Sequence, residues 1–458
     1  MCSVNDDCTF ENDNEVAKDK DLVDTTLCRK CKCYNVDILL NGPSGYCTTC
    51  FLIVTSHKFR AALGKSKIIR HGDLVLVDHS GDLNSTVLLH LIKDGMSKSA
   101  HKKLIFKIIV LYIDDSIIEK TNEEKDLLQH KIAEEIKGFG FNGYVVSLSQ
   151  VLNKEDTLDI KPIDEKLSHE NKDQLYKILA SLSDNTSKTD LIYQLRRKLL
   201  LLVAEKLKCN KIFVVDSAAD IAAKVLGDVC LGRGAQLSMQ ASFCDARCAD
   251  IMILKPLRDF TKQELVCYSK YHKISSIKSV ESNIQATSIQ ALARNFTTEL
   301  ESQFSGTVST IFRTADKISL KSNIQQRIED NCVLCDAKLD CALFNNEISA
   351  MRAIKISKLV SSEYVNTNSN NEENGDSNCL ESCSDNKKYC NNSIECNCEN
   401  NIKQQITMED VLRYLCYSCR RIFQNSEILC TLPPPLLFTI QQRIALNSMR
   451  EKISDFLL

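Results

Sequence analysis

The chain has 458 residues, 43% hydrophobic and 26% charged, a composition typical of a soluble globular protein with one large core and one or two small modules. No apolar run approaches the ~20 residues that cross a bilayer, and the N-terminus has neither the basic nor the apolar region of a secretory signal. We therefore expect a cytoplasmic protein with no membrane partner. The net charge of −2 does not by itself indicate nucleic-acid binding.

Charge is unevenly distributed over the first 70 residues. Residues 1–24 have a net charge of −6 and little to bury, so we expect a disordered acidic tail. Residues 28–70 have a net charge of +7, and such a basic segment could meet an anionic partner. A solvated basic face is the alternative.

Four cysteines in this basic segment have the spacing of a metal site. The pair Cys28 and Cys31 is separated by 15 residues from Cys47 and Cys50, which fits the spacing of zinc modules. In a reducing compartment, paired cysteines favour metal binding over disulfides. We predict a structural zinc module over residues 25–67, with Cys33 close enough in sequence to compete as a ligand. Four unrelated reduced cysteines are the alternative.

From about residue 68 to 330 the pattern changes to apolar strands that alternate with amphipathic helices. Strands are expected at 73–77, 104–113, 143–148, 211–215 and 251–254, and helices at 85–92, 123–137, 190–208, 217–226 and 261–271. Thr189 is the expected cap of the long helix at 190–208, which follows a polar stretch at 153–187. This alternation predicts an α/β domain whose parallel sheet is covered by helices on both faces. Ligands of such sheets lie beyond the carboxyl ends of the strands.

The loop after the first strand of this domain reads Ser80-Gly81-Asp82-Leu83-Asn84-Ser85. Its place before a helix suits phosphate binding through backbone N–H groups. The spacing resembles the S-G-G-x-D-S loop of PP-loop ATP pyrophosphatases, with Ser80, Gly81 and Ser85 as the matching positions. A plain strand-to-helix turn capped by serine is the alternative.

Two positions depart from the PP-loop pattern. Asp82 stands in place of the second glycine, and a carboxylate 4 Å from a phosphate charge costs ~1 kcal/mol in water and ~4 kcal/mol at a protein-surface dielectric. Asn84 replaces an aspartate and so removes an anionic partner for magnesium. We therefore do not expect this chain to bind ATP productively.

The C-terminal region, residues 331–458, contains a second set of paired cysteines. Cys332 and Cys335 lie 80 residues before Cys416 and Cys419, and a polar segment at 361–400 that we expect to be a flexible insert lies between them. Without the insert the two pairs could share one zinc ion. The alternative is that residues 379–398, which contain further cysteines, bind metal separately or not at all.

Several stretches in a fixed order resemble one known family, that of cytoplasmic tRNA 2-thiolation protein subunit 2, a degenerate branch of the PP-loop (adenine nucleotide hydrolase-like) proteins. They are 47–64 (CTTCFLIVTSHKFRAALG), 75–91 (VLVDHSGDLNSTVLLHL), 224–234 (KVLGDVCLGRG), 255–260 (KPLRDF), 415–421 (LCYSCRR), 432–436 (LPPPL) and 453–458 (ISDFLL). The resemblance extends from Cys28 to the C-terminus apart from the insert. It implies a PP-loop core flanked by N- and C-terminal zinc-binding cysteine modules.

The resemblance also implies a function. This subunit would be the non-catalytic half of a heterodimer whose catalytic PP-loop subunit 2-thiolates the wobble uridine (U34) of the tRNAs for lysine, glutamate and glutamine. The sulfur would come from a thiocarboxylated ubiquitin-related modifier. Basic residues would then contact tRNA beside the phosphate-loop cleft, and the candidates are Lys58, Arg60, Lys65, Lys67, Arg70 and Arg233.

Two other functions remain open from the sequence. The chain could be a divergent ATP-dependent tRNA sulfurtransferase that is active alone and uses Cys244 or Cys248. Against this, the segment 215–221 lacks the histidine that active relatives have near the nucleotide, and buried inert thiols are the simpler interpretation. The chain could also be a zinc-dependent interaction scaffold with no role in RNA modification.

Overall fold

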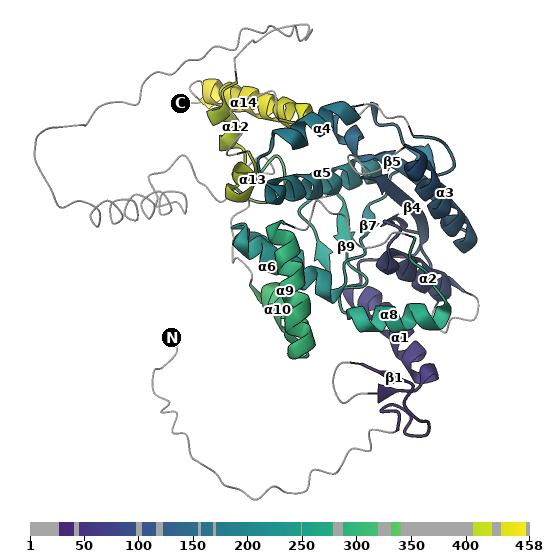
Figure 1. Ribbon diagram of the computed structural model, residues 1–458. Helices are drawn as coiled ribbons and strands as arrows, with labels where there is room; N and C mark the ends of the chain where they lie inside the picture. Colours follow the sequence, from purple (N-terminus) through teal and green to yellow (C-terminus); the bar gives the residue numbers. More distant parts are fainter. Residues whose placement is uncertain are drawn as a thin grey trace, which may run out of the picture.

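The computed structural model describes residues 27–40, 45–97, 103–115, 122–153, 157–167, 171–248, 250–277, 287–318, 331–339, 406–423 and 432–454. The predicted tail at 1–24 and insert at 361–400 lie outside these residues. Within them, seven strands form one sheet in the order β6-β5-β4-β3-β7-β9-β8 (Figure 1). Its strands are β3 (Leu74–Asp78), β4 (Lys107–Asp114), β5 (Asn142–Ser147), β6 (Lys161–Pro162), β7 (Lys211–Phe213), β8 (Cys244–Asp245) and β9 (Met252–Leu254).

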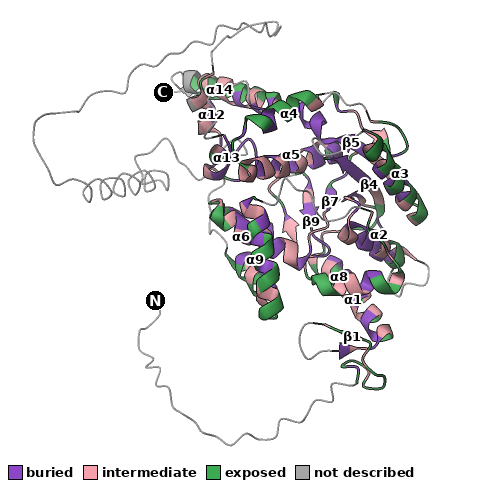
Figure 2. Ribbon diagram, in the orientation of Figure 1, coloured by how far each residue is buried: buried purple, intermediate pink, exposed green. Residues whose placement is uncertain are grey.

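The five central strands are parallel, and the short edge strands β6 and β8 pair antiparallel to their neighbours. Central strands of a parallel sheet are buried on both faces. In β3, Leu76 packs into the core on one face, whereas Val75 and Val77 pack into the core on the other. This two-sided burial explains the continuous apolar run of β3, which Figure 2 shows as buried strands at the centre of the molecule.

Helices cover both faces of the sheet, as predicted. One face carries α1 (Thr48–Ser66), α2 (Leu83–Met96), α3 (Asn122–Phe139) and α8 (Lys262–His272). The other face carries α4 (Lys172–Ser181), α5 (Asn185–Lys206) and the C-terminal helices α12 (Met408–Arg413), α13 (Tyr417–Ile422) and α14 (Pro434–Ser454). The described part of the C-terminal module thus shares a core with the α/β domain.

A third helical group packs beside the sheet. It comprises α6 (Ala218–Cys230), the short α7 (Leu237–Ala241), α9 (Ile289–Gln303) and α10 (Thr307–Lys317). Small side chains such as Ala218, Ala222 and Ala315 form much of its interior, which permits close approach of the helices. Short single-turn helices also occur at η1 (Leu148–Leu152) and η3 (Gly234–Gln236).

The predicted cap of the long helix is wrong. α5 begins at Asn185, because Asp184 accepts a hydrogen bond from the Ser187 N–H at 2.7 Å. Thr189 lies inside the helix and its hydroxyl donates to the Asn185 carbonyl. The stretch 153–187, expected only to separate two segments, also contains α4, whose Leu175, Ile178 and Leu179 are buried.

No helix among the described residues is both long enough and apolar enough to cross a membrane.

Candidate functional site

The N-terminal cysteines converge. The sulfur atoms of Cys28, Cys31, Cys47 and Cys50 all lie within 4.8 Å of one another. A two-stranded hairpin, β1 (Ile38–Leu39) with β2 (Gly45–Tyr46), returns the chain to Cys47, which begins α1. The set could therefore hold one metal ion in a small module at the surface of the protein.

Backbone donors lower the thiol pKa values of the first pair of this module, whereas burial raises the pKa of Cys50 to about 12. Burial raises the pKa of the Cys28 thiol, but backbone N–H groups of Cys31, Cys47 and Lys30 lower it to about 6. A cysteine with such a pKa is available as a thiolate ligand at neutral pH. The Asp37 carboxylate accepts from the Thr48 N–H at 2.9 Å, and this bond ties the hairpin to the start of α1.

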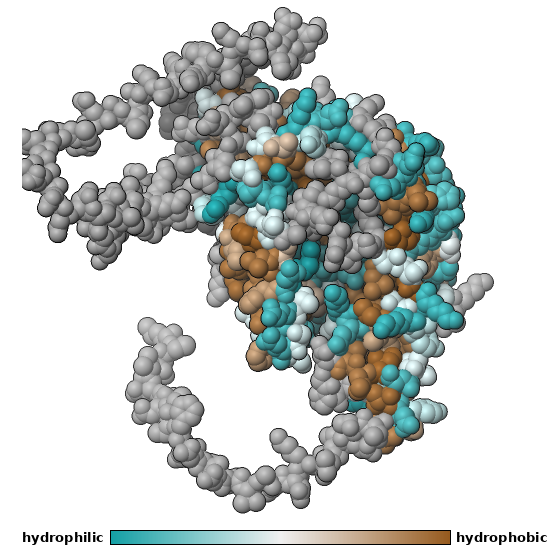
Figure 3. All heavy atoms as spheres, in the orientation of Figure 1, coloured by the Kyte–Doolittle hydropathy of each residue, from teal (hydrophilic) through white to brown (hydrophobic). Residues whose placement is uncertain are grey.

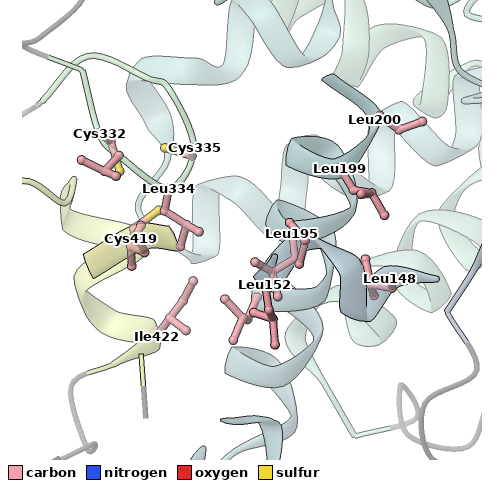
Figure 4. Packing of buried hydrophobic residues seen from close by; sticks show 14 of the residues in the cluster. Leu148, Leu152, Leu195, Leu199, Leu200, Cys332, Leu334, Cys335, Cys419 and Ile422 are labelled. Carbon is pink, nitrogen blue, oxygen red and sulfur yellow. The ribbon is translucent and has the colours of Figure 1, made fainter. Parts of the chain in front are cut away.

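The C-terminal cysteines also converge, although the two pairs are far apart in sequence. The sulfurs of Cys332, Cys335, Cys416 and Cys419 lie within 4.8 Å of one another, and all four residues are buried. Figure 4 shows Cys332, Cys335 and Cys419 beside the leucines of α5 and η1. This second set could also hold a metal ion, and it belongs to the core of the protein rather than to its surface.

The phosphate-like loop connects β3 to α2. Gly81 has a φ of 80°, a left-handed conformation that glycine adopts without strain. Asp82 is the N-cap of α2, and its Oδ1 accepts a hydrogen bond from the Ser85 N–H at 2.8 Å. The alternative prediction of a serine cap is therefore wrong, because the aspartate has this role. Ser80 Oγ is buried and has no hydrogen-bond partner in the described structure.

The capping geometry decides what this loop can bind. The N-terminus of a helix attracts a phosphate through its free N–H groups and dipole. Here a carboxylate of the chain itself occupies that position. A triphosphate would have to displace Asp82 and then tolerate its negative charge.

Further polar contacts join the strands' carboxyl ends to the helices around them. Arg196 from α5 donates to Asp78 at the end of β3 at 2.7 Å and lies 3.4 Å from Asp115 after β4. Burial raises the pKa of Asp78. On the other side of the loop, Asn84 donates to the Asp220 carboxylate at 3.0 Å. These side chains pair with one another at the carboxyl edge of the sheet.

The predicted tRNA contacts on α1 separate into two groups. Lys58 forms an ion pair with Glu264 of α8 at 2.7 Å, and Arg60 lies 3.9 Å from Asp94 of α2. In contrast, Lys65, Lys67 and Arg70 are exposed. Lys58 and Arg60 therefore help to pack α1 against its neighbours, whereas the second group is free to meet solvent.

The exposed group does not border the phosphate-like loop, contrary to our expectation. The chain passes from Lys65 and Arg70 into the amino end of β3, where the Gly72 N–H donates to the Ile105 carbonyl just before β4. The loop follows the carboxyl end of β3. The two therefore lie at opposite edges of the sheet, separated by the length of a five-residue strand, roughly 16 Å.

The prediction that Arg233 contacts tRNA is wrong. Its side chain is buried, at 2% exposure, and donates to the Asp190 carboxylate at 2.5 Å. Its Nη1 lies 3.7 Å from Cys419 Sγ. A buried guanidinium cannot reach a phosphate of tRNA, and sequence alone could not reveal this because its partners are distant along the chain.

With this geometry established, comparison with known proteins identifies the family. Residues 288–421 match the family model for cytoplasmic tRNA 2-thiolation protein 2. The protein of that name from Anopheles gambiae is 30% identical over 382 residues, covering 80% of this chain and 89% of that one. The chain belongs to this family. Its relative in Drosophila mojavensis is 32% identical over 332 residues, covering 70% and 77%, and that in Danio rerio is 28% identical over 480 residues, covering 94% of each chain.

The fold of this member of the tRNA 2-thiolation protein 2 family is similar to that of a solved thiolase. The U34-tRNA thiolase NcsA from Methanococcus maripaludis superposes with a TM-score of 0.50 at 17% identity, covering 70% of this chain and 97% of that one. The likeness confirms the predicted PP-loop type of α/β core.

That thiolase was solved with a [4Fe-4S] cluster. In the described part of this family member, the only groups of three or more potential metal ligands are the two cysteine sets at either end of the chain. Cys244 lies on the edge strand β8, where burial and then the neighbouring Asp245 raise the pKa of its thiol. A raised pKa disfavours the thiolate that sulfur transfer requires.

Proposed function

We propose that this chain is the non-catalytic subunit of a cytoplasmic heterodimer that 2-thiolates U34 of the tRNAs for lysine, glutamate and glutamine. Its partner would be a catalytic PP-loop subunit, and the sulfur donor a thiocarboxylated ubiquitin-related modifier. The observation that carries the proposal is the capping of α2 by Asp82, because the chain's own carboxylate fills the position that a phosphate needs.

Zinc is the metal that fits the two cysteine sets best. A tetrahedral zinc ion with Zn–S bonds of about 2.3 Å requires sulfur–sulfur separations of roughly 3.8 Å. The separation between Cys31 and Cys47 is 3.9 Å, and that between Cys335 and Cys416 is 3.7 Å. The four cysteines of a [4Fe-4S] cluster bind four different irons, which keeps their sulfurs farther apart. Bound zinc would be closed to water and would stabilise each module.

An exposed hydrophobic surface supports the existence of a protein partner. Val229 of α6 is 54% exposed, and Leu292 and Phe296 of α9 are 68% and 51% exposed. Figure 3 shows hydrophobic atoms gathered over α6 and the helices beside it. A shallow apolar groove lies between α6 and α10. Contiguous apolar surface of this kind on a soluble protein marks a site of interaction.

Contact with tRNA would come from Lys65, Lys67 and Arg70 at the amino edge of the sheet. These residues are exposed and close in sequence. Long-range attraction to the RNA backbone needs positive charge that is not already paired. We do not include Lys58 or Arg60 in this surface, because each already faces a carboxylate.

An omission assay tests the proposed function. The chain, the catalytic subunit and their complex are each supplied with tRNA, ATP and thiocarboxylated modifier, and 2-thiouridine is quantified. We expect product only when both subunits are present. Thiolation by this chain alone would support the sulfurtransferase alternative. Full activity of the catalytic subunit without this chain would contradict the proposal.

A further inference from the structure

The loop Leu231–Gln236, which joins α6 to α7, lies against both cysteine pairs of the C-terminal set. It contains the residues LGRG, part of the stretch 224–234 that resembles the family. The loop is separate from both the phosphate-like loop and the exposed basic residues Lys65, Lys67 and Arg70. Its contacts with the cysteine set are specific and buried.

The first half of the loop contacts the pair Cys416 and Cys419. Ser418, between these two cysteines, donates its hydroxyl to the Leu231 carbonyl at 2.7 Å. Gly232 has a φ of 79°, and a Cβ atom there would lie 2.6 Å from the ring of Tyr417. Only glycine allows both the backbone conformation and this close approach. Arg233 then places Nη1 at 3.7 Å from Cys419 Sγ.

The second half of the loop contacts the other pair. Gln236 directs its Nε2 at Cys335 Sγ, at 3.8 Å. Arg247 lies behind it, with Nη1 at 3.4 Å from Gln236 Oε1 and 3.2 Å from the Cys335 carbonyl oxygen. One short loop therefore aims a side-chain donor at a sulfur of each cysteine pair.

These donors match the needs of a buried thiolate site. Four thiolates around one divalent cation have a net charge of −2, and burial of uncompensated charge is costly. Arg233, fixed by ion pairs with Asp190 and Asp228, directs an N–H donor at Cys419, and Gln236 directs one at Cys335. Hydrogen bonds to a buried charged group offset part of its desolvation cost. Groups that hydrogen-bond to metal ligands orient them, and their loss typically weakens metal binding about 10–100-fold.

We propose that Arg233 and Gln236 form the outer coordination shell of a metal ion held by Cys332, Cys335, Cys416 and Cys419. In this arrangement the Leu231–Gln236 loop positions the thiolates, strengthens metal binding and links the loaded site to the ends of α6 and α7. The inference rests on metal binding by this cysteine set, which is part of the proposed function. The N-terminal set, with Cys31 half-buried at the surface, provides a comparison within the same chain.

The test measures Co²⁺ and Zn²⁺ affinity of the C-terminal set in the full-length chain, with Cys28→Ser and Cys31→Ser removing the other site. Gln236→Leu deletes one donor. Arg233→Met combined with Asp190→Asn deletes the other together with its closer carboxylate partner. Asp228, whose Oδ1 lies 3.7 Å from Arg233 Nε, stays in this variant, and because burial already raises the pKa of its carboxyl to about 7, we expect it to take up a proton once Arg233 is removed. We expect each to raise the zinc dissociation constant about 10–100-fold and to shift the thiolate-to-cobalt absorption band. Arg233→Lys should retain most of the affinity.

The pair Arg258 and Asp316 gives a matched control. This ion pair joins the loop after β9 to α10 at 2.6 Å, and within the described part of the chain it has no contact with a cysteine sulfur. Arg258→Met with Asp316→Asn should leave both the affinity and the band unchanged. Wild-type affinity and spectrum in the folded Gln236→Leu and Arg233→Met/Asp190→Asn proteins would overturn the outer-shell role alone. Absence of any metal at the wild-type C-terminal set would instead overturn the proposed metal site.

Discussion

Asp82 places a carboxylate oxygen 2.8 Å from the Ser85 N–H, where α2 offers its free backbone donors. The carboxylate that would repel a phosphate therefore stabilises α2. A glycine in this position would leave the donors available to a ligand, as the PP-loop pattern requires. On our proposal, the replacement exchanges phosphate binding for a local contribution to stability.

This capping role leads to a first prediction. Asp82→Ala should destabilise the chain by about 1 kcal/mol, because loss of an N-cap side chain typically costs this amount. Asp82→Asn should be close to wild type, since asparagine caps equally well. The midpoint of urea unfolding measures both. Equal stability of the alanine variant and the wild type would show that the carboxylate is not a cap in solution.

His90 gives a prediction for pH dependence. Its Nδ1 lies 2.8 Å from the Tyr268 hydroxyl, and its ring centroid lies 4.3 Å from that of His272. Burial, followed by the charge of His272, lowers the pKa of His90 to about 4. The usual value in an unfolded chain is about 6.5. As pH falls, the unfolded state therefore takes up the proton first, and the stability associated with neutral His90 is lost between about pH 6.5 and 4.

Between pH 7 and 5, we expect the melting temperature of the wild type to fall more steeply than that of the variant His90→Asn. Asparagine is chosen because its side chain retains a hydrogen-bond acceptor for Tyr268 but does not titrate. Thermal denaturation followed by circular dichroism measures the two slopes. Loss of metal at low pH affects both proteins alike, so the difference between them reports on His90. Parallel curves would contradict the lowered pKa.

At the scale of whole elements, the two cysteine modules have different relations to the fold. The N-terminal set packs mainly with its own hairpin, whereas Cys332, Cys335, Cys416 and Cys419 belong to the same core as Leu195 and Leu199 of α5. Loss of metal at the C-terminal set should therefore destabilise the packing of the helices on that face of the sheet. Loss at the N-terminal set should affect only its own module.

We predict that Cys419→Ser lowers the main melting transition by ~5 °C, equivalent to about 3–5 kcal/mol at roughly 1–1.5 °C for each kcal/mol in a chain of 458 residues. Cys31→Ser, the matched change in the other set, should leave this transition in place and make residues before α1 sensitive to limited proteolysis. Differential scanning calorimetry compares the variants. Equal effects of the two substitutions would contradict the assignment of the C-terminal set to the core.

Most of the helices and strands of the α/β domain, and both cysteine modules, could be predicted from the sequence, because strand–helix alternation and CxxC spacing are local signals. The expected strands and helices of the α/β domain all occur, with bounds shifted by a few residues. The sequence analysis predicted neither α9 nor α10. The inner face of α9 uses small residues, Ala291 and Ala293, while Leu292 and Phe296 face outward. In contrast, α10 buries Val308 and Phe312 four residues apart, a helical signal that the sequence does contain. The antiparallel edges β6 and β8 are two residues each and give no periodic signal.

Apart from the meeting of the two C-terminal cysteine pairs, contacts between distant segments could not be predicted. Arg233 looked like a surface cation, yet its partners Asp190 and Cys419 lie 43 and 186 residues away. Lys65 and Arg70 lie near the edge of the sheet where β3 begins. Which loops share that edge depends on the direction of the neighbouring strands, and this cannot be read from the sequence. The meeting of the two C-terminal cysteine pairs was predicted, because cysteine pairs repeat a recognisable local motif.

At the scale of the whole molecule, the exposed cations at the amino edge of the sheet give a prediction for tRNA binding. In the proposed complex, Lys65→Gln with Lys67→Gln should weaken tRNA binding and reduce the slope of log affinity against log salt by about 1 for each lost phosphate contact. Lys58→Gln is the control, since Lys58 is engaged by Glu264. Filter binding over a salt series measures the slopes. An unchanged slope in the double variant would place the tRNA elsewhere.

We propose that the isolated chain has the fold of a U34-tRNA thiolase but no working nucleotide site. Calorimetric titration of the purified chain with Mg²⁺–ATP, together with an assay for released pyrophosphate, tests this most directly. We predict no saturable heat of binding and no pyrophosphate, with both signals restored when the catalytic subunit is added. Stoichiometric ATP binding with pyrophosphate release by this chain alone would show that it has a working nucleotide site.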